Sequence, residues 1–357
     1  MSRRAPLIFP GAKTAAAARL ARLGSSRPCM VDDFHTFHVC PKKTDRRARR
    51  THALILFNFR LYNRDMVAHH HPADLLESWI KLRGAPVCVG MDPVFERLAP
   101  ACQKHDPARA FELWGKTFLD AIEQHVPAVK FQSACFERHG VAGMAALAKL
   151  LAHARGKFLV ILDGKRGDIG ISAEHYAAAV RDHFQADWVT ANAYLGVDGF
   201  SPFLQAGLGV FALVRTSNPS GDAVQGELLR DGRTVAQSVA DVLVEAGSRH
   251  MGACGFSALG AVVGATKSAD ALQLRQRMPH APFLVPGFGA QGGALADALR
   301  CFIHGRGALI TASRSVMQAF EDRDGEWSQH VADAAKSFAR EISIGVKDHL
   351  STAPTSA

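Results

Sequence analysis

The amino-acid sequence predicts an α/β protein built as a single (β/α)8 barrel, the TIM-barrel architecture. Short, almost uniformly apolar runs recur along the chain, and amphipathic segments of helical length separate them. Eight such repeats lie between about residue 73 and the C-terminus, which suits a barrel domain of about 250 residues. An open doubly wound sheet is the alternative. However, the turn after the first apolar run, Gly90-Met91-Asp92-Pro93, lacks the spaced glycines of a dinucleotide-binding loop.

The predicted elements follow one another in regular alternation. Strands are expected at residues 87–90, 128–132, 158–163, 188–193, 210–216, 261–266, 283–287 and 308–312. Helices are expected near 109–125, 141–155, 172–184, 233–249, 267–279 and 292–303, with a shorter one after Asp198 and a long one at about 327–348. Most of the apolar runs end in polar or charged residues. In a parallel barrel these residues gather at one rim, where active sites lie.

Charge divides the chain into two parts. The formal net charge is +9, yet residues 1–65 hold 14 Lys and Arg against 4 Asp and Glu, and residues 66–357 hold 28 against 29. We therefore expect a basic N-terminal extension, 1–65, and a barrel domain, 66–357. The extension is expected to be disordered or to result from a start assigned upstream of Met66. A basic arm that touches acidic surfaces and an organelle-targeting presequence are the alternatives. Because the main body is nearly neutral, no nucleic-acid partner is predicted.

Cysteine usage and hydropathy bear on the compartment. The seven cysteines are odd in number and form no C-x-x-C pair, so neither a disulfide framework nor a structural zinc site is expected. A reducing compartment fits this usage, and we predict a cytoplasmic protein. No run of eighteen apolar residues occurs, so we predict no membrane-spanning helix and no membrane partner.

The most informative charges follow the third predicted strand. Asp163 and Lys165 are two residues apart, so on an extended chain they share a face, and Asp168 follows on the loop. Lys130 ends the preceding strand and should be a lateral neighbour. A solvated ion-pair cluster is the alternative interpretation. Because these charges come directly after buried strands, we favour a functional array of two lysines and two aspartates, with no metal.

The last two strands suggest a phosphate site. The glycine-rich segment 287–293 exposes backbone N–H groups and leads toward a helix, and Arg314 after the eighth strand can supply a charged partner. A glycine-rich turn beside a surface arginine is the alternative. Gln291 could present an amide to a ligand or cap the helix, and Ser217 could bind a ligand or form a turn.

Together these motifs resemble the orotidine 5′-phosphate decarboxylase family, in particular its longer bacterial (type 2) subgroup. The resemblance covers about residues 70–345. It is carried by Val89-Gly-Met-Asp92-Pro, Val129-Lys130-Phe-Gln132, Asp163-Gly-Lys165-Arg-Gly-Asp168-Ile, Thr190-Ala-Asn-Ala-Tyr-Leu-Gly-Val-Asp198, Ser217-Asn-Pro219, Pro286-Gly-Phe-Gly-Ala-Gln291-Gly-Gly and Ser313-Arg314.

The resemblance implies a barrel enzyme that converts orotidine 5′-phosphate to uridine 5′-phosphate and carbon dioxide, the last step of pyrimidine nucleotide synthesis, without a cofactor. It assigns catalytic roles to Lys165, Asp163, Asp168 and Lys130. Lys165 would protonate the ring carbon that loses carbon dioxide, and Asp163 would lie near the substrate carboxylate. Asp168 would reach into the neighbouring subunit's site, which implies an obligatory homodimer.

The resemblance also assigns the substrate-binding residues. These are Asp92, Ser217, Pro286, Gln291, Gly292, Ser313 and Arg314. Asp92 and Lys130 would bind ribose hydroxyls, Ser217 and Gln291 would contact the pyrimidine, and Arg314 with the glycine-rich loop would hold phosphate. Residues 218–232 would form a mobile lid.

Two departures from the family pattern affect fine geometry only. Phe131 stands where proline is common, and Ser172 stands where threonine is frequent. Two other functions stay open. One is a metal-dependent sugar-phosphate decarboxylase or synthase on the same barrel. The other is a binding protein in which the basic arm contacts nucleic acid or an acidic membrane surface and the barrel is inert.

Overall fold

A computed structural model describes residues 71–289 and 293–352, and within them eight parallel strands close into a barrel. The strands are β1 (Val87–Met91), β2 (Ala128–Gln132), β3 (Leu159–Arg166), β4 (Trp188–Ala191), β5 (Gly209–Arg215), β6 (Leu259–Val263), β7 (Phe283–Val285) and β8 (Ala308–Ala312). Each strand pairs with its neighbours in sequence, and β1 closes on β8 with Cys88 opposite Thr311. The predicted barrel is thus confirmed.

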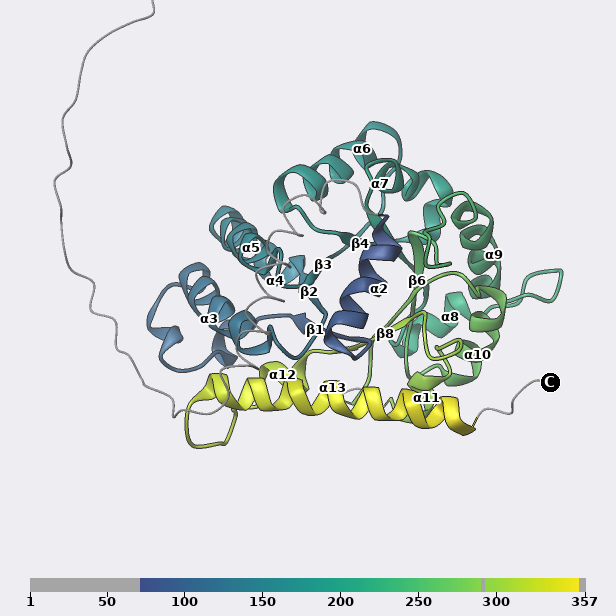
Figure 1. The fold of residues 1–357 in the computed structure, drawn as a ribbon. Helices are drawn as coiled ribbons and strands as arrows, with labels where there is room; N and C mark the ends of the chain where they lie inside the picture. The colour runs from purple at the N-terminus through teal and green to yellow at the C-terminus, as the bar shows by residue number, and fades with distance from the viewer. Residues whose placement is uncertain (1–70, 290–292, 353–357) are drawn as a thin grey trace, which may run out of the picture. The chain divides into compact units, whose positions relative to one another are not determined.

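Helices surround the barrel (Figure 1). The longer ones are α3 (Pro107–Ile122), α5 (Gly140–Ala154), α6 (Gly170–Ala178), α9 (Val235–Gly247), α10 (Ser268–Arg277) and α13 (Trp327–Thr352). Shorter ones are α4 (Ser133–Glu137), α7 (Ser201–Gln205), α8 (Asp222–Gln225), α11 (Leu295–Leu299) and α12 (Arg314–Met317). Figure 1 shows α13 in yellow along one side, where it packs against α3 and α11. None of the described helices is long and apolar enough to cross a membrane.

Local sequence signals explain where the helices begin. Asp106 caps α3 by accepting a hydrogen bond from the Arg109 backbone N–H, and Pro107 occupies the first turn, where no donor is needed. Thr234 and Gln237 form a reciprocal capping box at the start of α9. These caps satisfy backbone groups that would otherwise lack partners at a helix end.

The barrel interior is apolar at one end. Strand residues such as Leu159, Trp188 and Phe211 form one cluster, and Leu76 and Trp79 of α2 (Pro72–Arg83) pack into it. Figure 1 shows α2 lying across the barrel mouth that faces the viewer. No sequence pattern predicted α2, because few apolar residues mark its buried face, among them Ala73, Leu76 and Trp79. The helix thus covers the N-terminal ends of the strands, whereas polar residues gather at their C-terminal ends.

Boundaries differ from the predictions at several ends. The seventh strand stops at Val285, because a glycine-rich loop follows, and the helix expected at 292–303 is only α11. The helix predicted at 172–184 is α6 followed by a π-helical turn, Ala179–Phe184. The predicted extension, 1–65, lies outside the described residues, as does Met66.

Candidate active site

Polar side chains form a layer above the apolar interior, at the C-terminal ends of the strands. They line a cavity of about 720 Å³. Its walls include Asp92, Lys130, Cys135, Asp163, Lys165, Thr190, Thr216, Ser217, Gln225, Pro286, Gly287, Thr311, Ser313 and Arg314. Nearly every strand contributes a residue at or just beyond its end. The cavity therefore has the position of a barrel active site.

Asp163 is the centre of the charged cluster. Lys130 Nζ lies 2.6 Å from Asp163 Oδ2, and Lys165 Nζ lies 2.7 Å from Asp163 Oδ1. Lys130 also lies 3.5 Å from Asp92. Three of the four predicted array members are thus in direct contact. Lys130 is 6% exposed and Asp163 is 5% exposed, whereas the Lys165 side chain is 47% exposed and reaches the cavity.

The pKa values of the buried pair follow from their mutual attraction. Burial alone would raise the pKa of Asp163, but the ammonium groups of Lys130 and Lys165 hold it far below its usual range. Burial alone would lower the pKa of Lys130, but Asp92 and Asp163 raise it above its usual value. The carboxylate and the ammonium therefore both stay charged at neutral pH.

The backbone around Lys165 is irregular, and this aims its side chain. The pairing register of β3 and β4 shifts between Leu162 and Arg166, and Lys165 adopts a φ of 44°, which is uncommon for a residue with a side chain. Its backbone N–H donates to Thr190 Oγ1 at 3.0 Å, and that hydroxyl donates to Asp163 Oδ1 at 2.7 Å. Thr190 therefore contacts both Lys165 and Asp163 and fixes their relative position.

Thr190 is a site residue to which the sequence analysis assigned no role. Gln132 is another, since its Nε2 donates to Asp163 Oδ2 at 3.3 Å. Their positions in the strands carried a signal for both residues. Gln132 is paired with Asp163 in the sheet register, and Thr190 is the second-last residue of the buried strand β4. Threonine is common in strands, so its identity alone indicated nothing.

Asp168 lies apart from the other three array members. It is half-buried, it does not line the cavity, and its Oδ1 accepts a hydrogen bond from the Ile169 backbone N–H at 2.9 Å. The array of four predicted from the pattern is therefore an array of three within one chain.

Asp92 and Ser313 both lie close to Gly90, where β1 pairs with β8. A Cβ atom at Gly90 would lie 2.0 Å from Ser313 Oγ and 3.3 Å from Asp92 Oδ2. The missing side chain at Gly90 thus creates the space in which Ser313 enters the cavity. Backbone N–H of Asp92 contacts Met317 Sδ at 3.2 Å, which ties the end of β1 to α12.

The predicted phosphate site is partly described. Pro286, Gly287 and Arg314 line one end of the cavity beside Ser313. Gly287 has a φ of 95°, so the backbone turns there in a way that favours glycine. Gln291 and Gly292 lie outside the described residues. Among the residues described, no group of three or more His, Cys, Asp or Glu side chains is arranged to hold a metal ion.

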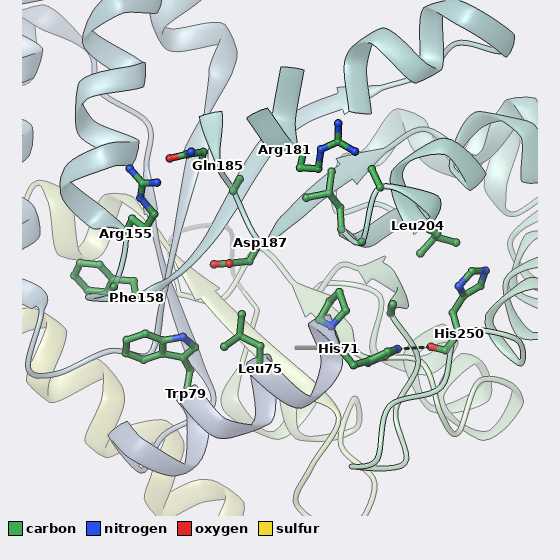
Figure 2. Close-up of a pocket in the computed structure, with 17 residues that line it drawn as sticks. His71, Leu75, Trp79, Arg155, Phe158, Arg181, Gln185, Asp187, Leu204 and His250 are labelled. Atoms are coloured by element: carbon green, nitrogen blue, oxygen red, sulfur yellow. Dashed lines mark hydrogen bonds between the residues drawn. The ribbon is translucent and has the colours of Figure 1, made fainter. Parts of the chain in front are cut away.

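A second cavity, of about 670 Å³, lies at the opposite end of the barrel, beside α2 (Figure 2). Its wall includes Trp79, Arg155 and Asp187. Asp187 Oδ2 accepts a hydrogen bond from Val160 N–H at 2.7 Å, and burial raises its pKa to about 7. No lysine of the described residues lines this cavity, and it lies at the end where barrel enzymes do not place their chemistry.

The fold and the first cavity define a (β/α)8-barrel protein in which two lysines contact one buried aspartate at the rim of the barrel. The family model described as "Orotidine 5′-phosphate decarboxylase / HUMPS family" matches residues 86–327. The chain belongs to this family.

Individual relatives agree with that assignment. An orotidine 5′-phosphate decarboxylase of Rhodopirellula baltica is 39% identical over 268 residues, which cover 69% of this chain and 88% of the relative. One of Clostridium perfringens is 32% identical over 289 residues, covering 78% and 99%. The structure of Leishmania donovani OMP decarboxylase is 29% identical, with a TM-score of 0.64 and coverage of 78% and 99%.

Proposed function

We propose that this protein decarboxylates orotidine 5′-phosphate to uridine 5′-phosphate and carbon dioxide, the last step of pyrimidine nucleotide synthesis. The observation that carries the proposal is the contact of Lys165 and Lys130 with one buried carboxylate, Asp163, inside the rim cavity. Two comparisons support the proposal. The chain belongs to the family, and it matches relatives that are named for this activity over most of their length.

Lys165 is the proposed proton donor. When the bond between the ring and the carboxylate breaks, carbon dioxide leaves and the electron pair stays on the ring carbon. An ammonium group already fixed beside that carbon stabilises the developing negative charge and then gives it a proton. Asp163 and Lys130 contribute by keeping Lys165 charged and oriented. Asp163 also faces the leaving carboxylate with a like charge.

Other residues are proposed to bind the parts of the substrate that are remote from the reacting carbon. Asp92 and Lys130 would bind the ribose hydroxyls, and Ser217 with Gln291 would bind the pyrimidine. Pro286, Gly292, Ser313 and Arg314 would surround the phosphate. Binding energy from these remote groups raises turnover when it is used to close and order the site.

A homodimer would complete the site with Asp168. The loops after β3 and β4 and the first turn of α6 support this proposal, because they carry exposed apolar side chains beside Asp168. These are Ile169 (56% exposed), Ile171 (68%), Tyr194 (86%) and Leu195 (44%). Apolar residues grouped at the rim of a site are typical of a surface that a partner covers. A second copy would bring Asp168 to the neighbouring Lys165.

We further propose that the enzyme works without a cofactor, that it acts in the cytoplasm, and that it binds neither nucleic acid nor membranes. All five cysteines in the described part of the chain are free, which suits a reducing compartment. The alternative is a metal-dependent sugar-phosphate decarboxylase or synthase on the same barrel. Both oxygens of Asp163 are already occupied by lysines, which leaves that carboxylate poorly suited to a divalent cation.

Product analysis tests the proposal. The purified full chain is incubated with orotidine 5′-phosphate in the presence of a chelator, and nucleotide and carbon dioxide are quantified. Equimolar uridine 5′-phosphate and carbon dioxide are expected. Absence of both, together with turnover of a sugar phosphate after magnesium is added, would favour the sister activity instead.

A further inference from the structure

We propose that Gln225 is a positioning residue for the reaction: through Thr216 it fixes the backbone that presents the Ser217 hydroxyl to the substrate. The inference rests on the proposed function, since it takes Ser217 as a pyrimidine contact. It concerns residues 216–225, the segment that leaves β5 and ends with α8, which we call the arch.

The Gln225 amide closes the arch at both of its ends. Its Oε1 accepts a hydrogen bond from the Thr216 backbone N–H at 2.8 Å, and its Nε2 donates to Thr216 Oγ1 at 2.9 Å. Thr216 and Gln225 are nine positions apart in the sequence. The hydrogen bonds of one side chain therefore hold the two ends of the loop together. Both residues line the cavity.

Close packing leaves the arch little freedom. A Cβ atom at Gly221 would lie 2.9 Å from Thr216 Oγ1 and 3.3 Å from Gln225 Oε1. A Cβ atom at Gly264, just beyond β6, would lie 2.9 Å from the Ser217 nitrogen and Cα. The backbone of Ser217 is therefore pressed against β6 from one side while Gln225 holds its neighbour from the other.

Ion pairs anchor the base of the arch. Arg215, buried at the end of β5, lies 2.7 Å from Asp222 and 2.6 Å from Asp270. Lys267 lies 2.6 Å from Asp222. Burial alone would lower the pKa of Arg215, but the two carboxylates raise it. The charges tie α8 to the ends of β5 and α10, so the first half of the predicted lid, 218–225, is held at its base.

Ser217 gains a defined position from these contacts. Its side-chain hydroxyl has no hydrogen-bond partner within residues 71–289 and 293–352, although it is half-buried and lines the cavity. A polar group left unpaired at a binding site is available to a ligand, and its value depends on how well it is fixed. The neutral amide of Gln225 suits an anionic substrate, because it holds Thr216 without adding a negative charge.

A double-mutant cycle on the full chain tests the inference. Gln225→Ala, Ser217→Ala and the double variant are compared by kcat/KM for orotidine 5′-phosphate, with Gln276→Ala, an exposed change on α10, as the matched control. We expect Gln225→Ala to lower kcat/KM by about 10-fold to 100-fold. In the Ser217→Ala background the same change should cost less than about 3-fold, because its effect passes through Ser217.

One further variant separates positioning from folding. Gln225→Glu keeps an acceptor for the Thr216 N–H and hydroxyl, so it should retain the melting temperature while raising KM through charge repulsion. Additive losses for Gln225→Ala and Ser217→Ala, or full activity of Gln225→Ala, would overturn the inference while the wild type stays active. Inactivity of the wild type itself would instead refute the proposed function.

Discussion

The Lys165 backbone N–H donates to the Thr190 hydroxyl at 3.0 Å, so the residue proposed to move the proton is held by a side chain of the next strand. The same hydroxyl donates to Asp163, and this leaves it no further proton to give. Thr190 thus links the strained backbone of Lys165 to the carboxylate that orients its side chain.

Replacing Thr190 tests this link. Thr190→Val has nearly the same shape but neither hydrogen bond, so we expect kcat to fall by about 10-fold to 100-fold. The free energy of unfolding should fall by about 1–3 kcal/mol, because a buried carboxylate loses a donor. Thr190→Ser should stay near wild type in both. Equal kcat for the valine variant and the wild type would contradict the proposed role.

Asp163 should matter for stability as well as for activity. Asp163→Asn removes the carboxylate that lies between the ammonium groups of Lys130 and Lys165, and Lys130 stays buried. We expect the free energy of unfolding to fall by about 3–5 kcal/mol. Urea denaturation at pH 7 measures this. Lys165→Ala serves as the comparison, since it keeps the Lys130–Asp163 pair. A milder effect of Asp163→Asn than of Lys165→Ala would refute the expectation.

The pKa of Asp163 also sets a pH dependence. Because the folded state lowers this pKa, the stabilisation is fully present above the unfolded value, near 4. It is lost as pH falls from there toward the much lower folded value. The stability of Asp163→Asn relative to the wild type should therefore improve as pH is lowered below about 4. A constant difference between pH 7 and pH 3 would contradict this assignment.

Asp187 should have the opposite pH effect. Burial raises its pKa to about 7 in the folded state, so the folded protein loses stability as pH rises from about 4 to about 7. Asp187→Asn keeps an acceptor for Val160 N–H and removes the ionisation. Over this pH range the free energy of unfolding of the variant should rise relative to that of the wild type by at most about 4 kcal/mol. Parallel stability curves for the two proteins would show that Asp187 does not titrate there.

Subunit mixing tests the proposed contribution of Asp168 to the site of a second copy in a homodimer. Lys165→Ala and Asp168→Ala homodimers are each expected to be nearly inactive. A heterodimer has one site with both residues intact, so random mixing after reversible dissociation should restore about a quarter of wild-type activity. Mixing Lys165→Ala with Lys130→Ala is the control, because both residues lie in the same chain's site. No recovery in the first mixture would place Asp168 outside the shared site.

The barrel and much of its site could be predicted because each depends on local patterns. Apolar runs of strand length predicted the order of elements, and the positions of Lys130 and Asp163 at the ends of neighbouring strands predicted that their side chains lie close together. Thr190 and Gln225 escaped prediction because they act through hydrogen bonds to the backbone, at positions set by a bulge in β3 and by the arch. The spacing pattern alone placed Asp168 with the other three residues, because one chain's sequence does not show where a loop points. Only the family resemblance implied that Asp168 reaches the site of a neighbouring subunit.

The most direct test of Lys165 is a comparison of two lysine variants in one assay. Decay of the ultraviolet absorbance of orotidine 5′-phosphate is followed in the presence of chelator for the wild type, Lys165→Ala and Lys347→Ala, an exposed lysine on α13. We predict that Lys347→Ala keeps the wild-type rate and that Lys165→Ala loses at least about 1000-fold in kcat. Substantial decarboxylation by a folded Lys165→Ala protein would contradict the assignment of Lys165 as the proton donor.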